Sequence, residues 1–320
     1  MPEELLQRER KFIRDMEEIK YSVIIPNLHS PVIGRVLSAL KEQVGVEGEI
    51  EILVVGRDKY CLVKNEDNIR FIESERNLSA SEARNKGIDS AKGDVIFFLD
   101  ADCIPKRDWL IKLLEVYSKD YSYVGGAVTF EKDSFWTLCD NVSHFGLLSP
   151  GIKRGVADKF NVHTANMCIS KKILCEVGMF DERYQMGEDF DLGIRLRKAG
   201  YIPFFEPSAI VVHKPERDSF RAFIKHTADW APYSIFLRIL HRDILKTPKV
   251  FFYWPFLILF SPLISLYVTF KIFFAHPPLL KYWYTMPFVF LDKMAWCLIS
   301  ARELITKDVH KRFLTESGKP

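Results

Sequence analysis

The chain has 320 residues, of which 48% are apolar and 27% are charged. At roughly 100–200 residues per domain, this length allows one large domain with an appendage. The formal net charge of +3 gives no support for a nucleic-acid partner, and six cysteines without Cys-x-x-Cys spacing favour a reduced compartment with buried thiols.

The first segment, residues 1–20, places apolar residues at helical spacing among many charges. Its apolar face would carry Leu5, Phe12, Met16 and Ile19, so the pattern predicts an amphipathic helix. The density of charge distinguishes the segment from a secretory signal peptide. Such a helix packs on the domain, pairs with another copy or lies on a membrane, and packing is the simplest of these.

Residues 21–213 alternate short apolar runs with helical patterns. The predicted strands cover residues 21–26, 51–55, 69–72, 95–99, 123–128, 161–170 and 210–213. The predicted helices cover residues 32–43, 79–91, 109–117, 171–177 and 190–198. This alternation with short connections predicts an α/β fold with a mostly parallel, Rossmann-like sheet. Residues 133–160 contain Pro150 and several glycines, and we expect them to be irregular.

The strand predicted over residues 95–99 ends in two carboxylates, Asp100 and Asp102. The run before them is free of charge, which is typical of a strand buried on both faces of a sheet. Ligands in open α/β sheets bind beyond the carboxyl ends of the strands. Paired carboxylate oxygens there suit Mg²⁺ or Mn²⁺, and such an ion can neutralise a diphosphate. The plainer alternative is a solvated turn.

The motifs between Tyr21 and His213 resemble those of family 2 glycosyltransferases, inverting enzymes with the A-type fold. They are Ser22–Pro26, Asn77, Ala83–Gly87, Asp100–Asp102, Gly125-Gly126, Asn166, Gly178–Asp181 and Glu188-Asp189. Their order and spacing carry the resemblance, because each motif alone is modest. It implies a Rossmann-like nucleotide-sugar-binding fold with a mixed central sheet.

The resemblance also implies roles for single residues. Asp102 would bind the Mg²⁺ or Mn²⁺ ion that bridges the donor diphosphate, with His213 as a further metal ligand. Asp189 would be the base that deprotonates the acceptor hydroxyl, and Glu188 would orient the acceptor or the base. The implied donor-binding residues are Pro26, Asp58, Arg84, Asp100, Asp102 and Asn166.

These residues also have plainer explanations. Arg84 suits a helix surface, Asn166 a turn or a strand ladder, and His213 a satisfied strand end. Acidic residues such as Glu188 and Asp189 are favoured at any helix N-terminus. Their coincidence with the other motifs favours the functional interpretation for the acidic pair.

The segment after the second predicted strand departs from the family pattern. Family members carry one or two acidic residues there, which help to hold the nucleotide base, whereas this chain has Gly56-Arg57-Asp58. Either Asp58 acts one or two positions late, or Arg57 changes the contacts of the base. Donors carrying UDP and donors carrying GDP are both expected.

The last hundred residues are basic and aromatic, and then apolar. Residues 250–270 contain no charge, and a span of the hydrocarbon core takes about 20 apolar residues. Residues 279–301 are apolar but interrupted by Lys281 and by Asp292-Lys293, so they form a second span or an interfacial helix. Basic residues on both sides of these segments place both ends in the cytoplasm.

We therefore predict an amphipathic helix (1–20), a catalytic domain (21–230) and a membrane-associated helical region (231–320). The expected activity is metal-dependent, inverting transfer of a single sugar from a nucleotide-diphospho-sugar to a hydroxyl of a lipid-linked or cell-surface glycan, on the cytoplasmic side of the cell membrane. A processive polysaccharide synthase is the nearest rival, but residues 226–230 lack its Gln-x-x-Arg-Trp motif. A catalytically silent membrane adaptor is the other. No Gly-x-Gly-x-x-Gly follows the first strand, which disfavours a dinucleotide oxidoreductase.

Overall fold

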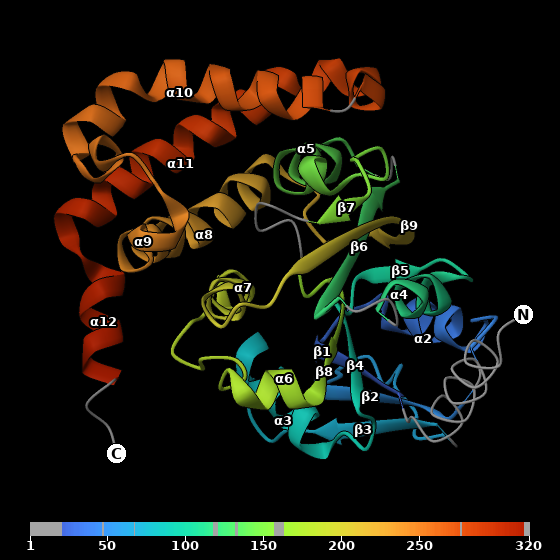
Figure 1. Ribbon diagram of the computed structural model, residues 1–320. Coiled ribbons are helices and arrows are strands. Elements are labelled where there is room, and N and C mark those ends of the chain that lie inside the picture. Colours follow the sequence, from blue (N-terminus) through green and yellow to red (C-terminus); the bar gives the residue numbers. More distant parts are fainter. Residues whose placement is uncertain are drawn as a thin grey trace, which may run out of the picture.

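The computed structural model describes residues 21–46, 48–66, 68–117, 121–131, 134–156, 163–275 and 277–316. The helix predicted over residues 1–20 lies outside the described residues. A twisted sheet with helices on both faces forms the body of the molecule (Figure 1). Long C-terminal helices cross one end of this body as a separate layer (Figure 1).

The sheet is mixed, as the resemblance implies, and its order is β3-β2-β1-β4-β8-β6-β9-β5, with β7 paired to β9. The first four strands in this order pair in parallel, and β8 runs antiparallel to both β4 and β6. The strands are β1 (Tyr21–Leu28), β2 (Ile50–Arg57), β3 (Ile69–Glu73), β4 (Val95–Leu99), β5 (Cys103–Pro105), β6 (Tyr123–Phe130), β7 (Gly155–Val156), β8 (Asn166–Ser170) and β9 (Pro203–His213).

Two apolar cores lie on opposite faces of the sheet. Helices α2 and α4 cover one face, and α3, α6 and α7 cover the other. The start of α3 is fixed by a capping box, in which Ser79 and Glu82 each accept a hydrogen bond from the backbone of the other. These helices are α2 (Ile33–Lys41), α3 (Ala80–Ser90), α4 (Trp109–Tyr117), α6 (Lys171–Glu176) and α7 (Glu188–Lys198).

The expectation of irregular structure over residues 133–160 is wrong for most of the described part. Residues Phe135–Phe145 form helix α5, which continues into a short 3₁₀ turn, η1 (Gly146–Leu148). Leu138 and Val142 of α5 are buried against Phe273 of the C-terminal layer. The helix is therefore stabilised by packing against residues more than a hundred positions away, which local propensity does not reveal.

The C-terminal layer continues directly from the catalytic domain. Its helix α8 (Phe220–Leu240) runs unbroken through the boundary predicted at 230/231, so that boundary falls inside a helix. Helix α11 packs between α10 and α8, and α5 packs on α8 and α11. The remaining elements of the layer are α9 (Arg242–Leu245), η2 (Lys249–Phe252), α10 (Trp254–Ala275), η3 (Pro277–Thr285), α11 (Met286–Thr306) and α12 (Asp308–Glu316).

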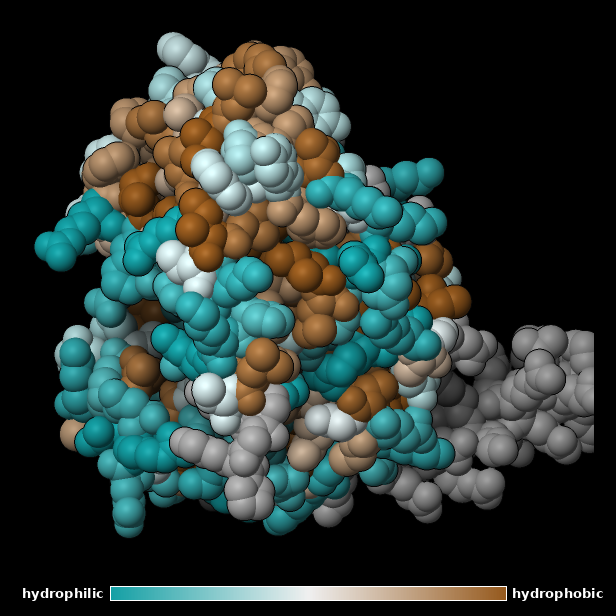
Figure 2. Space-filling view, turned by 90° about the vertical axis from the view of Figure 1, so that its left-hand side faces the viewer, coloured by the Kyte–Doolittle hydropathy of each residue, from teal (hydrophilic) through white to brown (hydrophobic). Residues whose placement is uncertain are grey.

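The outer surface of this layer is apolar. Figure 2 shows hydrophobic side chains gathered over its upper part, above a largely hydrophilic body. On α10, Leu259, Leu263 and Tyr267 are 73%, 63% and 67% exposed. Among the described helices one, over Trp254–Phe274, is long and apolar enough to cross a membrane. This helix holds most of the uncharged run that the sequence predicts as a span.

In the second apolar segment, the charged pair Asp292-Lys293 contacts neighbouring helices. Asp292 of α11 is fully buried and accepts hydrogen bonds from Ser143 of α5 and Thr227 of α8. Its neighbour Lys293 donates to the same carboxylate over 3.0 Å. The paired charge predicted here therefore attaches α11 to the two helices nearest the sheet.

Candidate active site

A cleft of about 470 Å³ opens at the carboxyl ends of β1, β2 and β4, beside the starts of α3 and α7. This is the edge where ligands of open α/β sheets bind. The predicted residues that line it are Pro26, Arg84, Asp100, Asp102 and Glu188. The fold thus brings together side chains from four different elements.

Arg84 links the end of β4 to the start of α7. Its side chain is nearly fully buried and donates to Glu188 Oε1 over 2.6 Å and to Asp100 Oδ1 over 2.7 Å. Burial raises the pKa of Asp100 and of Glu188, and the positive charge of Arg84 opposes this only in part. Arg84 is therefore the cation that keeps two carboxyls of the cleft wall in place.

Asp102 faces His213 across the pairing of β5 with β9. His213 Nε2 lies 3.5 Å from Asp102 Oδ2. The other ring nitrogen, Nδ1, contacts Asn141 Oδ1, and the amide of Asn141 donates to the His213 carbonyl. This amide orientation makes Asn141 Oδ1 the acceptor for Nδ1–H, so Nε2 is the ring nitrogen that faces the carboxylate. A carboxylate oxygen and an imidazole nitrogen, both possible metal ligands, thus meet at one point.

Electrostatics at this pair favour ionised Asp102. Burial raises its pKa, but the charge and hydrogen bond of His213, together with the charge of Arg217, lower the pKa below its ordinary value. The neighbouring Cys103 Sγ lies 3.9 Å from Asp102 Oδ1. Burial and the nearby carboxylates raise the pKa of Cys103 well above its usual range, so it stays a protonated thiol and a poor metal ligand.

Asp189 pairs with a histidine that the sequence analysis did not select. His163 Nδ1 lies 3.0 Å from Asp189 Oδ2, and the backbone N–H of Phe190 donates to Asp189 Oδ1 over 2.7 Å. Burial raises the pKa of Asp189, but the hydrogen bond and charge of His163 and the charge of Arg84 lower it below its usual range. Asp189 is therefore a carboxylate at neutral pH, as a general base must be.

The start of α7 that holds this base needs a glycine. Gly187 precedes the helix with a φ of +83°, in the left-handed region. A Cβ atom there would also lie 2.6 Å from the ring of Trp230. Both constraints favour glycine and fix the direction in which Glu188 and Asp189 leave the turn.

Residues 22–170 match the model of glycosyl transferase family 2. The matched part, just under half of the chain, is similar to that family. The match begins in β1 and ends with β8, so it contains Arg84, Asp100 and Asp102 but stops before Glu188, Asp189 and His213.

Curated relatives extend the likeness beyond this region. Glycosyltransferase AglE of Haloferax volcanii is 26% identical over 202 residues, covering 60% of this chain and 66% of that protein. The pre-mycofactocin glycosyltransferase of Mycobacterium tuberculosis is 27% identical over 211 residues, covering 61% of this chain and 43% of that protein. The matched region thus spans less than two thirds of each of these relatives' lengths.

A solved structure shows the same fold. TarS of S. aureus, in a crystal structure of residues 1–349, superposes with a TM-score of 0.50 at 15% identity. The superposition covers 66% of this chain and 65% of that one. At this identity the likeness concerns the fold alone, and it agrees with the predicted A-type glycosyltransferase fold.

The expected donor contact of Asn166 needs correction. Asn166 is buried, its Oδ1 accepts from Trp109 Nε1 over 2.7 Å, and its Nδ2 donates to the carbonyls of Ala127 and Ala209 over 2.9 Å each. Its amide thus ties β6, β8 and β9 together. Gly126 is a glycine because a Cβ there would lie 2.4 Å from this amide.

Asp58 is also used locally. Its Oδ1 accepts from the N–H of Tyr60 and its Oδ2 from the N–H of Val63, so it holds the loop after β2 in an Asx-type turn. It is not among the residues that line the cleft. The predicted contact between Asp58 and the sugar donor therefore stays a prediction that no structural contact supports.

Two cations beside Asp102 escaped the sequence analysis. Lys214 and Arg217, which follow β9, line the cleft. Arg217 donates to Asp140 over 2.9 Å, and His226 holds the other oxygen of Asp140 over 2.7 Å. The basic residues just after His213 were a visible signal, but their direction depends on Asp140, which lies in the helix that the sequence did not predict.

Proposed function

We propose that this chain transfers one sugar from a nucleotide-diphospho-sugar to an acceptor hydroxyl, with inversion at the sugar. The observation that carries the proposal is the pairing of Asp102 with His213 and of Asp189 with His163 at one sheet edge. Arg84 connects the two pairs through Asp100 and Glu188. In such an arrangement the Asp102 pair acts on the leaving diphosphate, and the Asp189 pair acts on the attacking acceptor hydroxyl.

The donor set of Asp102 and His213 fits a divalent cation. A carboxylate oxygen and the Nε2 nitrogen of an imidazole point at one place. The carboxylate suits Mg²⁺ or Mn²⁺, and imidazole is a common ligand of transition-metal ions such as Mn²⁺. A cation bound there would neutralise the negative charge of the departing diphosphate. Lys214 and Arg217 add fixed positive charge on the same side of the cleft.

Asp189 supports the attack by the acceptor. Its carboxylate takes the proton of the acceptor hydroxyl while that oxygen forms the bond to the anomeric carbon. The bond from the anomeric carbon to the diphosphate breaks, and the nucleoside diphosphate leaves with the electron pair. One base opposite one leaving group implies a single displacement, which inverts the configuration. His163 keeps Asp189 ionised for this step.

The apolar C-terminal layer suggests an acceptor held at a membrane. Two relatives bear names that point the same way: a dolichyl-phosphate-linked sugar transferase of Methanococcus voltae, 26% identical over 175 residues, and an N-acetylglucosaminyl-diphospho-decaprenol L-rhamnosyltransferase of Mycobacterium tuberculosis, 41% identical over 63 residues. A lipid-linked acceptor at the cytoplasmic face of the cell membrane is the version of the proposal that we favour.

Repeated addition by a polysaccharide synthase finds less support. In this chain the region of the synthase motif lies in α8, where His226 and Thr227 hold the buried carboxylates of Asp140 and Asp292. These side chains are occupied by contacts between helices. A product one sugar longer than a defined acceptor is expected.

The test is a donor screen with purified chain in detergent, scoring slow hydrolysis of UDP- and GDP-sugars with Mg²⁺ or Mn²⁺. Hydrolysis of one donor should disappear on chelation and in Asp102→Asn, while the matched surface variant Asp108→Asn keeps the parent rate. Asp189→Asn should abolish transfer to an acceptor alcohol. Metal-dependent nucleotide binding with neither hydrolysis nor transfer to any acceptor would instead support the adaptor.

A further inference from the structure

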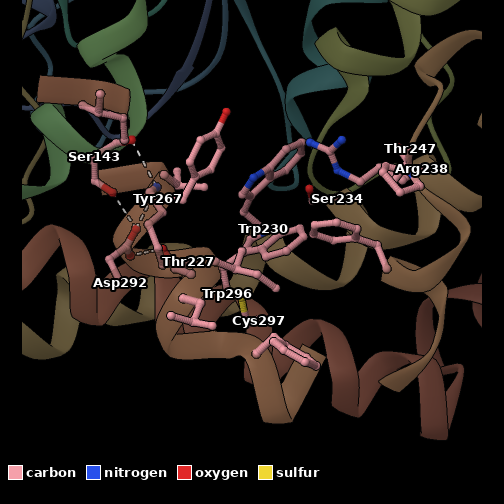
Figure 3. A pocket seen from close by; sticks show the side chains of 18 of the residues that line it. Ser143, Thr227, Trp230, Ser234, Arg238, Thr247, Tyr267, Asp292, Trp296 and Cys297 are labelled. Carbon is pink, nitrogen blue, oxygen red and sulfur yellow. Dashed lines mark hydrogen bonds and ion pairs between the residues drawn. The ribbon is translucent and has the colours of Figure 1, made fainter. Parts of the chain in front are cut away.

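A second cavity, of about 660 Å³, lies between α8, α10 and α11, apart from the cleft (Figure 3). Its walls are mainly aromatic and aliphatic side chains, among them Trp230, Phe256, Phe260 and Trp296. Leu263 and Tyr267 line it too, and they belong to the exposed apolar face of α10. The cavity wall is therefore shared with the surface that suits lipid.

The two polar ends of this cavity differ (Figure 3). At one end the charge of Asp292 is already balanced by Lys293 and by the hydroxyls of Ser143 and Thr227. At the other end lies Arg238, with Thr247 beside it. The polar groups at the first end therefore satisfy one another, whereas the polar groups at the second end lack a partner.

Arg238 is a partly buried cation without a counter-ion. In the described part of the chain no carboxylate pairs with it, and its Nε is buried without a hydrogen-bond partner. Its neighbours are rings, with the centroids of Phe190 and Trp296 each 5.9 Å from the guanidinium carbon. The hydroxyl of Thr247 is likewise buried and unpartnered. Such groups are costly to bury unless an anion completes them.

The Arg238 end of the cavity borders the proposed base. Phe190, which Arg238 covers, follows Asp189 directly in α7. Trp230 of the cavity wall packs against the turn at Gly187, just before the same helix. An anionic group at Arg238 would thus sit one side chain away from the helix turn that carries Asp189.

We propose that this cavity holds the lipid of the acceptor, a single-chain polyprenyl phosphate, with its phosphate on Arg238, Lys246 and Thr247 and its chain along α10. The proposal rests on the proposed function and names its acceptor class. A phosphate matches the unpartnered donors, since guanidinium and phosphate form charge-assisted hydrogen bonds. The apolar walls match the chain, and the shared face of Leu263 and Tyr267 lets the rest of the chain reach the bilayer.

The experiment measures binding of radiolabelled polyprenyl monophosphate to the full chain in detergent, without donor. Inorganic phosphate, phosphatidylglycerol and uncharged polyprenol compete in separate arms. We expect saturable binding that only the polyprenyl phosphate itself displaces efficiently. Arg238→Gln should weaken binding roughly tenfold or more, because a hydrogen bond to a charged group is lost. The matched variant Arg221→Gln, on the exposed side of the same helix, should bind as the parent does.

A second variant guards against misfolding of the first. Thr247→Val keeps the shape of the side chain and removes the unpartnered hydroxyl, and it should weaken binding a few-fold. Equal binding by the parent, Arg238→Gln and Thr247→Val would overturn the proposal. Equal displacement by phosphatidylglycerol would also overturn it and assign the cavity to bulk lipid, and displacement by inorganic phosphate alone would assign it to a free anion.

The binding assay is independent of transfer. If the donor screen fails while Arg238-dependent binding of polyprenyl phosphate is found, the lipid site stands and the transferase proposal falls. If transfer to a lipid acceptor is found while the variants bind like the parent, the transferase stands and the cavity proposal falls.

Discussion

At the scale of single residues, Arg84 has the largest structural consequence in the site. It reaches two carboxyls from different elements, of which Glu188 is nearly buried and Asp100 is partly exposed. Replacing a whole buried ion pair by apolar side chains changes the free energy of unfolding little. Removing only one partner leaves the other charge buried and uncompensated. Arg84 therefore acts on the site by positioning Asp100 and Glu188.

Replacing Arg84 by methionine should lower the free energy of unfolding by about 3–5 kcal/mol, because the nearly buried Glu188 and the partly exposed Asp100 lose their shared cation. Chemical denaturation followed by circular dichroism measures this. Arg76→Met is the matched control, since Arg76 pairs with Glu82 from an exposed position, and such pairs contribute about 0–1 kcal/mol. Similar losses in the two variants would contradict the role of Arg84.

A second residue-scale prediction concerns His163. Its hydrogen bond and charge hold the pKa of Asp189 below its ordinary value, so the base stays ionised well into acid. In His163→Ala that pKa rises, and the acidic limb of the pH–rate profile for transfer moves to higher pH. His310→Ala on the exposed face of α12 should keep the parent profile. An unshifted limb in His163→Ala would show that His163 does not tune the base.

At the scale of elements, the contact between α5 and α8 joins the catalytic sheet to the C-terminal layer. Asp140 of α5 accepts from Arg217 and is held by His226 of α8, and all three lie at least partly buried. The hydrogen bond and charge of His226 outweigh burial and lower the pKa of Asp140. The orientation of Arg217 toward the cleft thus depends on a helix–helix contact.

This contact predicts acid sensitivity. Burial, and then the positive charge of His144, lowers the pKa of His226 from 6.5 to about 4. Between these values the unfolded chain binds a proton that the folded chain does not, so the stability should fall as the pH drops from about 6.5 to about 4, by at most roughly 3 kcal/mol. His226→Asn should flatten this part of the unfolding curve, whereas His310→Asn should leave it. A parent whose stability is constant over this range would refute the prediction.

At the scale of the whole molecule, the chain divides into a polar body and an apolar cap (Figure 2). The cap exposes large side chains in a continuous layer over α10 and the neighbouring elements. A soluble protein rarely presents so large an apolar surface without a partner. A lipid surface is the partner that also fits the second cavity, whose wall includes Leu263 and Tyr267 of this face.

This division predicts binding to vesicles. The double substitution Leu259→Asp with Leu263→Asp should reduce co-sedimentation with phospholipid vesicles at least roughly tenfold, because each buried leucine contributes about 1.5–3 kcal/mol and each new charge opposes insertion. Leu62→Asp, on an exposed position of the catalytic body, is the control and should sediment like the parent. Equal sedimentation of both variants would mean that α10 does not meet the membrane.

The sequence by itself determined most of the strands and helices from β1 to β9, but not β5, β7 or α5. It also determined the placement of Asp100 and Asp102 after a buried strand and the capped start of α3. These follow from local rules, because apolar period, capping residues and turn residues act within a few positions. The uncharged run that becomes α10 was visible for the same reason.

Only the tertiary structure decided which distant residues contact one another. Arg84 meets Glu188 from 104 positions away, and Asn141 meets His213 from 72. Asn166 turned inward because its amide satisfies three separate core groups, and α5 formed because the C-terminal layer covers its apolar side. Such contacts depend on which side chains are left unsatisfied once the chain has folded, a balance over the whole molecule that no local pattern encodes.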